Sequence, residues 1–224
     1  MKIIVCLSPS RGGSSPTPIG LDDAYALALA LGLGETHAVT AMLAGSAPDD
    51  GPLRRALSAG AARAVRVVGE DFGSADFHTL GQALGTAIKR VGADLVLTGA
   101  RSVDDGMGAV PAAIARHVGG LHVACIEALA AADGGVEISV RGGGRRRRLR
   151  LPLPAVLSVV ASGPAMPPLP DRGVESPAIE VLSLVDPEAT VVRRRTELLG
   201  QPELPRRTTE EVTSAGALVD ALLG

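Results

Sequence analysis

Short apolar runs alternate with amphipathic helical stretches along the first half of the chain. The apolar runs are rich in Val, Ile, Leu and Ala, the composition of strands that are buried on both faces. The predicted strands span residues 2–7, 38–44, 64–68 and 94–98, and the predicted helices span residues 24–33, 52–59, 75–91 and 110–118. This alternation predicts a parallel sheet with helices on both of its faces.

The pattern changes after Gly119-Gly120. Strand-like runs joined by short turns follow at residues 122–128, 136–140, 145–151 and 155–161, and they predict antiparallel strands added to the parallel core. Residues 162–178 are rich in Pro and Gly and predict a long surface loop, before a last possible strand at 179–184. The polar remainder ends in a predicted helix at 210–223. We therefore expect one domain over residues 1–185 and an arm over residues 186–224.

Composition narrows the possible classes of protein. The 224 residues suffice for one α/β domain with an extension. No apolar run approaches the ~20 residues of a membrane helix, and the first apolar run is too short for a signal peptide, so we expect a cytoplasmic protein without membrane insertion.

A net charge of −2 and only three aromatic residues argue against nucleic-acid binding. Cys6 and Cys125 lie in predicted buried strands without metal or redox spacing, so we expect two core thiols.

Candidate catalytic chemistry is missing from the sequence. The four histidines lie on different predicted elements, and no serine–histidine–aspartate arrangement, Walker loop or zinc-ligand spacing occurs. We therefore assign no catalytic residue and no metal ligand. The one dense charge run is Arg145 to Arg148. On a strand its side chains alternate between faces, which favours a solvated edge or a partner contact over nucleic-acid binding.

The stretch ADLVLTGARSVDDGMGAVPA, residues 93–112, joins a predicted buried strand to a predicted helix through a glycine-bearing turn. Backbone N–H groups at such a helix start face the positive end of the helix dipole and bind anions, most commonly phosphate. The alternative is an ordinary strand–helix connection whose glycines serve only tight turning. Gly106-x-Gly108 without a third glycine leaves both readings open.

The order of several short segments resembles the β subunit of electron-transfer flavoproteins over roughly residues 1–184. The matching segments are KIIV at 2–5, D-x-Y-A-L at 23–27, LRRALSAGA at 53–61, DLVLTG at 94–99, VD-x-G at 103–106, LPAV at 153–156, LP at 169–170 and IEVL at 179–182. The resemblance implies a three-layer α/β fold with a mostly parallel sheet of the adenine-nucleotide-binding (HUP-like) type. The expected fold also has an antiparallel extension and a C-terminal arm that crosses onto a partner subunit.

The resemblance also implies an electron carrier rather than an enzyme. In the implied heterodimer an α subunit holds most of a FAD, which this chain helps to bury, and a dehydrogenase docks on this chain. AMP, or a second FAD in bifurcating relatives, is implied at a nucleotide site made of Cys6, Ala44, Asp104, Asp105, Gly106, Met107, Gly108, Ala109 and Val110. The loop over residues 164–176 is implied to dock the dehydrogenase through Leu169, with Pro170 beside it. A Leu169 that simply folds back on the domain remains the alternative.

Several positions depart from the family pattern. Gly20-Leu21-Asp22 stands where the family has Asn-Pro-aromatic, and a glutamate important for electron transfer falls near Arg141, where no acidic residue occurs. Ala109 and Val110 carry no side-chain donors for a phosphate, so we expect AMP occupancy to be partial. The rival hypothesis is a stand-alone nucleotide-binding or sensor protein of the same fold, whose arm makes a homodimer. An acyl- or adenylyl-transferring enzyme lacks a candidate nucleophile.

Overall fold

The computed structural model describes residues 1–8, 19–45, 50–69, 72, 75–101, 106–163, 167–172, 178–184 and 214. The helices within these residues are α1 (Leu21–Gly32), α2 (Gly51–Ala59), α3 (Phe77–Val91) and α4 (Val110–Val118). The strands are β1 (Lys2–Leu7), β2 (Ala38–Ala44), β3 (Arg63–Val68), β4 (Leu95–Gly99), β5 (Leu121–Ala132), β6 (Gly135–Gly142), β7 (Arg145–Pro152), β8 (Ala155–Val159) and β9 (Glu180–Ser183). The predicted arm, 186–224, lies outside the described residues apart from Ser214.

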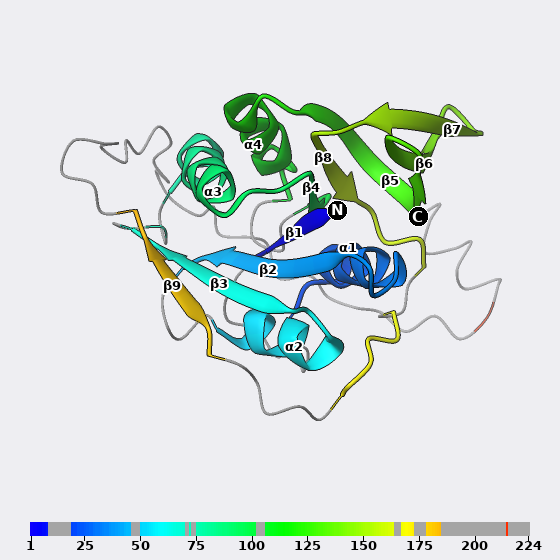
Figure 1. The fold of residues 1–224 in the computed structure, drawn as a ribbon. Coiled ribbons are helices and arrows are strands. Elements are labelled where there is room, and N and C mark those ends of the chain that lie inside the picture. Colours follow the sequence, from blue (N-terminus) through cyan, green and yellow to red (C-terminus); the bar gives the residue numbers. More distant parts are fainter. Residues whose placement is uncertain are drawn as a thin grey trace.

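The strands form one sheet in the order β7-β6-β5-β8-β4-β1-β2-β3-β9. Helices α1 and α2 cover one face and α3 and α4 the other (Figure 1). Alternate residues of β1 serve the two layers: Ile3 and Val5 pack toward α1 and α2, whereas Ile4 and Cys6 pack toward α3 and α4. Burial on both faces explains why this strand is a continuous apolar run. The three-layer α/β fold with a mostly parallel sheet is confirmed.

Local chemistry sets the ends of the helices. The carboxylate of Asp76 accepts a hydrogen bond from the Thr79 N–H at 2.8 Å, so α3 begins at Phe77 rather than at the predicted residue 75. Pro52 lies in the first turn of α2, where its missing N–H costs nothing, and Gly60 ends that helix with a φ of +113°.

The late strands are only partly antiparallel. Strands β5, β6 and β7 form the expected antiparallel extension. The expectation is wrong for β8, which lies parallel between β4 and β5. The possible last strand at 179–184 is present as β9, which pairs parallel with β3 at the far edge. An apolar run shows that a strand is buried, but the neighbours of that strand depend on long-range pairing that local sequence does not encode.

The two cysteines occupy different environments. Cys6 is buried as expected, but Cys125 is exposed, which corrects the expectation of two core thiols. The register of β5 against β8 shifts between Val123 and Ile126, and Cys125 lies in that bulge with a φ of +57°. Its N–H donates to Ser158 Oγ at 3.2 Å. A bulge turns a side chain out of the alternating pattern, and the sequence gives no signal for this one.

None of the described helices is long and apolar enough to cross a membrane. In the same residues there is no group of three His, Cys, Asp or Glu side chains suited to holding a metal ion.

Candidate functional site

The sheet has a topological switch point between β1 and β4. The chain leaves β1 through α1 toward β2 and β3, and then returns through α3 to β4 on the other side of β1 (Figure 1). In open α/β sheets the crevice outside the carboxyl ends of two such strands is where ligands bind. Ser8 follows β1 and Gly99 ends β4, so these two residues mark the switch point at the carboxyl ends of the strands.

Asp23, in the first turn of α1, bridges the two strand ends. Its Oδ2 accepts a hydrogen bond from the Ser8 N–H at 2.8 Å, and its Oδ1 accepts one from the Gly99 N–H at 3.0 Å. A Cβ at position 99 would lie against Asp23 Oδ1, so the close approach requires glycine there. The neighbouring carboxylate of Asp22 accepts the Ala161 N–H at 2.8 Å, just beyond β8. The two aspartates therefore fix three carboxyl ends of the sheet.

Burial changes the acidity of Asp23. Desolvation raises its pKa from 3.8 to about 6, against the lowering effect of the Ser8 and Gly99 hydrogen bonds, and the charge of Asp22 raises it further. Burial and the nearby Asp23 also raise the pKa of the Cys6 thiol to about 12. Cys6 is therefore a protonated, unreactive core thiol at neutral pH.

The glycine turn before α4 is built for close backbone contact at one of its two glycines. Gly106 and Gly108 have φ values of +64° and +63°, and a Cβ at position 108 would lie 2.5 Å from the Ala100 carbonyl oxygen. A Cβ at position 106 would meet open space. Helix α4 then begins at Val110 with Ala109 as an N-cap that makes no side-chain hydrogen bond. The start of α4 therefore presents backbone N–H groups and the positive end of the helix dipole without a side-chain cap.

The described members of the predicted nucleotide site gather at the same end of the sheet. Cys6, Ala44 and Val110 pack in one apolar cluster between the sheet and helices α3 and α4. The side chain of Met107 is 63% exposed beside them. Asp104 and Asp105 lie outside the described residues, so their predicted role stays a prediction.

Sequence reasoning missed Asp23 and Arg101 at this end of the sheet. Carboxylates in the first turn of a helix complement the helix dipole, which is a local effect, whereas the bridging role of Asp23 depends on tertiary contacts. The signal that existed was the match at residues 23–27. Arg101 Nε lies 3.8 Å from Asp22 with its side chain 66% exposed, so it places a cation just before the glycine turn.

Segment 167–172, which contains the predicted docking residues, is held against α2 by hydrogen bonds. Arg55 donates to the carbonyl oxygens of Leu169 at 2.8 Å and Pro170 at 3.0 Å. The Arg172 N–H donates to the Ser58 carbonyl oxygen at 2.9 Å. Pro170 is exposed, whereas the half-buried side chain of Leu169 packs against the core under α1 and α2. Leu169 thus folds back in part on the domain.

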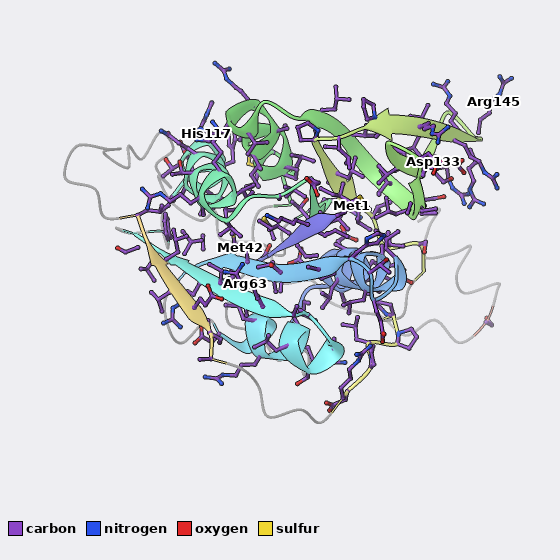
Figure 2. All side chains as sticks on the ribbon, viewed as in Figure 1. Met1, Met42, Arg63, His117, Asp133 and Arg145 are labelled. Carbon is purple, nitrogen blue, oxygen red and sulfur yellow. The ribbon has the colours of Figure 1, made fainter. Side chains whose placement is uncertain are left out.

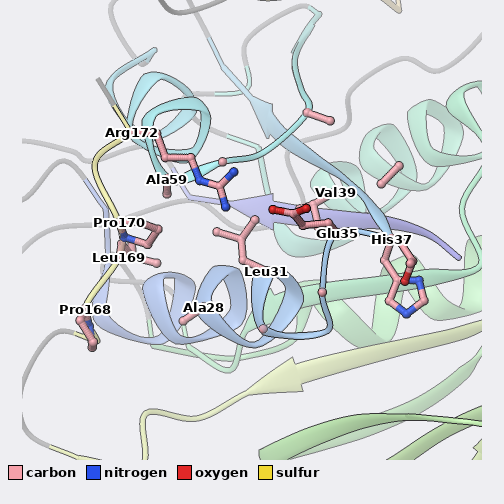
Figure 3. Close-up of a pocket in the computed structure, with 16 residues that line it drawn as sticks. Ala28, Leu31, Glu35, His37, Val39, Ala59, Pro168, Leu169, Pro170 and Arg172 are labelled. Carbon is pink, nitrogen blue, oxygen red and sulfur yellow. The ribbon is translucent and has the colours of Figure 1, made fainter. Parts of the chain in front are cut away.

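A pocket of about 660 Å³ lies beside this segment, at the amino ends of the parallel strands (Figure 3). Leu31 and Glu35 line it from the end of α1 and the following turn, Ala59 from the end of α2, and Leu169 and Arg172 from the segment 167–172. Strand amino ends lie opposite the switch point, so this pocket is separate from the glycine turn. The sequence pattern did not indicate it, since its walls come from three distant parts of the chain.

The fold and the switch point define the class: a doubly wound α/β domain whose strand order reverses between β1 and β4. The electron transfer flavoprotein domain family matches residues 18–187. The chain belongs to that family, as a divergent member similar to its β subunits.

Relatives at about one-third identity support the same placement. Protein FixA of Azorhizobium caulinodans is 30% identical over 155 residues, which cover 65% of this chain and 55% of that protein. Protein FixA of Bradyrhizobium diazoefficiens is 30% identical over 155 residues, covering 65% and 54%. The electron transfer flavoprotein subunit beta of Syntrophomonas wolfei is 32% identical over 125 residues, covering 56% and 49%. The chain spans about half the length of the curated relatives it matches.

Proposed function

We propose that this chain is the small, β-type subunit of a heterodimeric electron transfer flavoprotein. The observation that carries the proposal is the family match over residues 18–187. In this role an α-type subunit holds the FAD, and the present chain covers the flavin and receives a dehydrogenase. The flavin supplies the redox chemistry, so the chain acts as a carrier subunit in the cytoplasm and not as an enzyme.

The nucleotide site of this proposal is the turn that ends at α4. Its support is the pair of left-handed glycines, the tight approach of Gly108 to Ala100 and the uncapped start of α4. The bound nucleotide is AMP, held through its phosphate. Ala109 and Val110 supply no side-chain hydrogen bonds, each of which is worth roughly 0.5–1.5 kcal/mol and more when the partner is charged, as a phosphate is. The loss of two such bonds weakens binding by about tenfold to a few hundredfold, which makes AMP occupancy partial.

The docking surface of this proposal is the segment 167–172. Its support is the pair of Arg55 hydrogen bonds, which hold the backbone in place before a partner arrives. A segment that is already ordered loses little entropy on binding. Leu169 and Pro170 present an apolar contact next to the pocket of Figure 3. The dehydrogenase approaches at the amino ends of the strands, away from the nucleotide.

The domain division is part of the same proposal. Residues 1–185 form the nucleotide-binding domain, and residues 186–224 form an arm that contacts the α-type subunit. The support is compositional, because the sequence after residue 186 holds too little apolar surface for a domain of its own.

Co-purification tests the proposed function. The full chain is co-expressed with candidate α-type subunits, and the complex is then mixed with reduced candidate dehydrogenases. We expect a one-to-one heterodimer whose flavin is reduced, with the Leu169→Ala variant slowing reduction about tenfold at unchanged flavin content. If the chain forms a homodimer and binds none of the α-type subunits, the proposal is contradicted and the stand-alone nucleotide-binding protein is favoured. An unchanged reduction rate in Leu169→Ala would remove Leu169 from the docking surface.

A further inference from the structure

The antiparallel extension ends in a strand edge dominated by arginine. Strand β7 carries Arg145–Arg148 and Arg150, and the adjacent β6 carries Arg141. Residues 121–152 hold six arginines against three carboxylates, in a chain whose net charge is −2. All six arginines are exposed. Figure 2 shows Arg145 projecting from the far end of the hairpin, away from the helices.

The carboxylates neutralise only one face of this hairpin. Arg141 and Arg146 both bind Glu127, at 2.8 and 3.1 Å, and this pairing holds the pKa of Glu127 below its usual value. On the other face, Arg145 and Arg147 have no carboxylate partner in the part of the chain that the structure describes. Arg147 pairs across the ladder with Val140, which offers no charge.

This concentration of charge is unfavourable in the isolated chain. Arg141 and Arg146 lie directly opposite each other in the ladder, and among the described residues only the shared carboxylate of Glu127 offsets the repulsion between these like charges. Arg145 and Arg147 are two residues apart and therefore share a face. Charged side chains keep a strand edge from aggregating, and β7 carries five arginines on one edge. Local conflict of this kind in an otherwise consistent fold marks a functional surface.

The backbone of β7 offers a second kind of contact. β7 is the terminal strand of the sheet and pairs only with β6 among the described residues. Its outward N–H and C=O groups can therefore accept one more strand. A strand added there would have its own side chains beside arginines on both faces of the sheet.

We propose that the β7 edge binds a carboxylate-rich extended segment of a protein partner, which adds to the sheet as a further strand. Carboxylates match arginine because the guanidinium group donates two parallel hydrogen bonds to them. A nucleic acid or an anionic membrane would need cations gathered on one face, whereas these arginines lie on both faces of the strand with carboxylates between them. The proposal rests on the hairpin alone and stands whether or not the chain is a flavoprotein subunit.

Binding of a labelled peptide, Glu-Glu-Val-Glu-Glu-Val-Glu, to the full chain tests this proposal by fluorescence anisotropy. We expect saturable binding that weakens as the salt concentration rises. Two control peptides, one with glutamine in place of glutamate and one with N-methylated backbone amides, should not bind in this way. The Arg145→Gln/Arg147→Gln variant should bind about tenfold more weakly. The matched control Arg54→Gln/Arg116→Gln removes two exposed arginines elsewhere and should bind as the wild type does.

Hydrogen–deuterium exchange locates the contact. The peptide should protect outward amides of residues 145–151 and leave β9, the other edge of the sheet, unchanged. The Arg145→Gln/Arg147→Gln variant should also unfold at the same or a higher denaturant concentration, since it removes repulsion. The proposal is overturned by absent peptide binding, by equal binding of the N-methylated peptide, or by protection at β9 alone. Tighter binding to a DNA duplex or to phosphatidylserine vesicles would likewise overturn it.

Discussion

Asp23 is the residue on which the carboxyl end of the sheet depends most directly. One buried carboxylate satisfies the backbone N–H groups that follow β1 and end β4. Two unsatisfied donors in that position would each cost roughly 1–3 kcal/mol. The charge itself is costly to bury, which is why the pKa of Asp23 rises to about 6. The free-energy cost of burying Asp23 is thus offset by the two hydrogen bonds that fix the strand ends at the switch point.

Asp23→Asn should destabilise the fold by ~2 kcal/mol at neutral pH, because one amide oxygen cannot serve two N–H donors. The folded wild type keeps a proton on Asp23 up to about pH 6, whereas the unfolded chain releases it near 3.8. Wild-type stability therefore falls relative to the variant as the pH rises from about 4 to about 6.

Urea unfolding of both proteins across this pH range measures that difference. Asp22→Asn is the matched control, since Asp22 accepts a single backbone N–H from Ala161 and an amide oxygen can replace it. A stability difference that stays constant with pH would show that Asp23 titrates normally.

The two glycines of the turn before α4 provide a second test at single residues. Asn tolerates left-handed φ values better than most residues, so Gly106→Asn should change the free energy of unfolding by no more than about 0.5 kcal/mol. Gly108→Asn drives a Cβ toward the Ala100 carbonyl and should cost about 1–3 kcal/mol. Denaturant unfolding measures both, and AMP extracted from each purified variant should be lower for Gly108→Asn. Equal behaviour of the two variants would contradict the close approach at Gly108.

At the scale of elements, the hydrogen-bonded contact between α2 and the segment 167–172 supports the docking proposal. Arg55→Gln removes two hydrogen bonds to that segment, whereas Arg54→Gln alters an exposed side chain on the same helix. We expect Arg55→Gln to speed hydrogen exchange at the Arg172 amide about fivefold, the equivalent of ~1 kcal/mol. Flavin reduction by the dehydrogenase should slow while flavin content is unchanged. Equal exchange in the two variants would mean that other contacts order the segment.

Elements were more predictable from the sequence than their arrangement. The strand at 38–44 and the helix at 110–118 match the structure residue for residue, because burial on both faces and helical periodicity are properties of local sequence. The insertion of β8 between β4 and β5 was not predictable, since pairing joins segments far apart in the chain. The bridging role of Asp23 and the pocket beside Leu169 were not predictable from the sequence for the same reason. Both arise only when distant elements meet.

At the scale of the whole molecule, the two ends of the parallel strands divide the proposed roles. The carboxyl ends hold the switch point, the Asp23 bridge and the glycine turn, which is the proposed nucleotide site. The amino ends hold the pocket and the segment 167–172, which is the proposed docking surface. The arginine edge of β7 lies at one end of the sheet order, with β9 at the other. Nucleotide and protein contacts are thereby kept on separate surfaces.

The flavin content of the chain, alone and with its partner, tests the central claim most directly. The full chain is purified alone and in complex with an α-type subunit, and the visible absorbance spectrum of each is recorded before and after denaturation. We predict a colourless isolated chain and a yellow complex with one FAD per heterodimer. The reason is that Gly20-Leu21-Asp22 replaces the Asn-Pro-aromatic pattern, which the family resemblance implies to be a contact with the flavin. Stoichiometric FAD on the isolated chain would contradict the account and make this chain a flavin-binding protein in its own right.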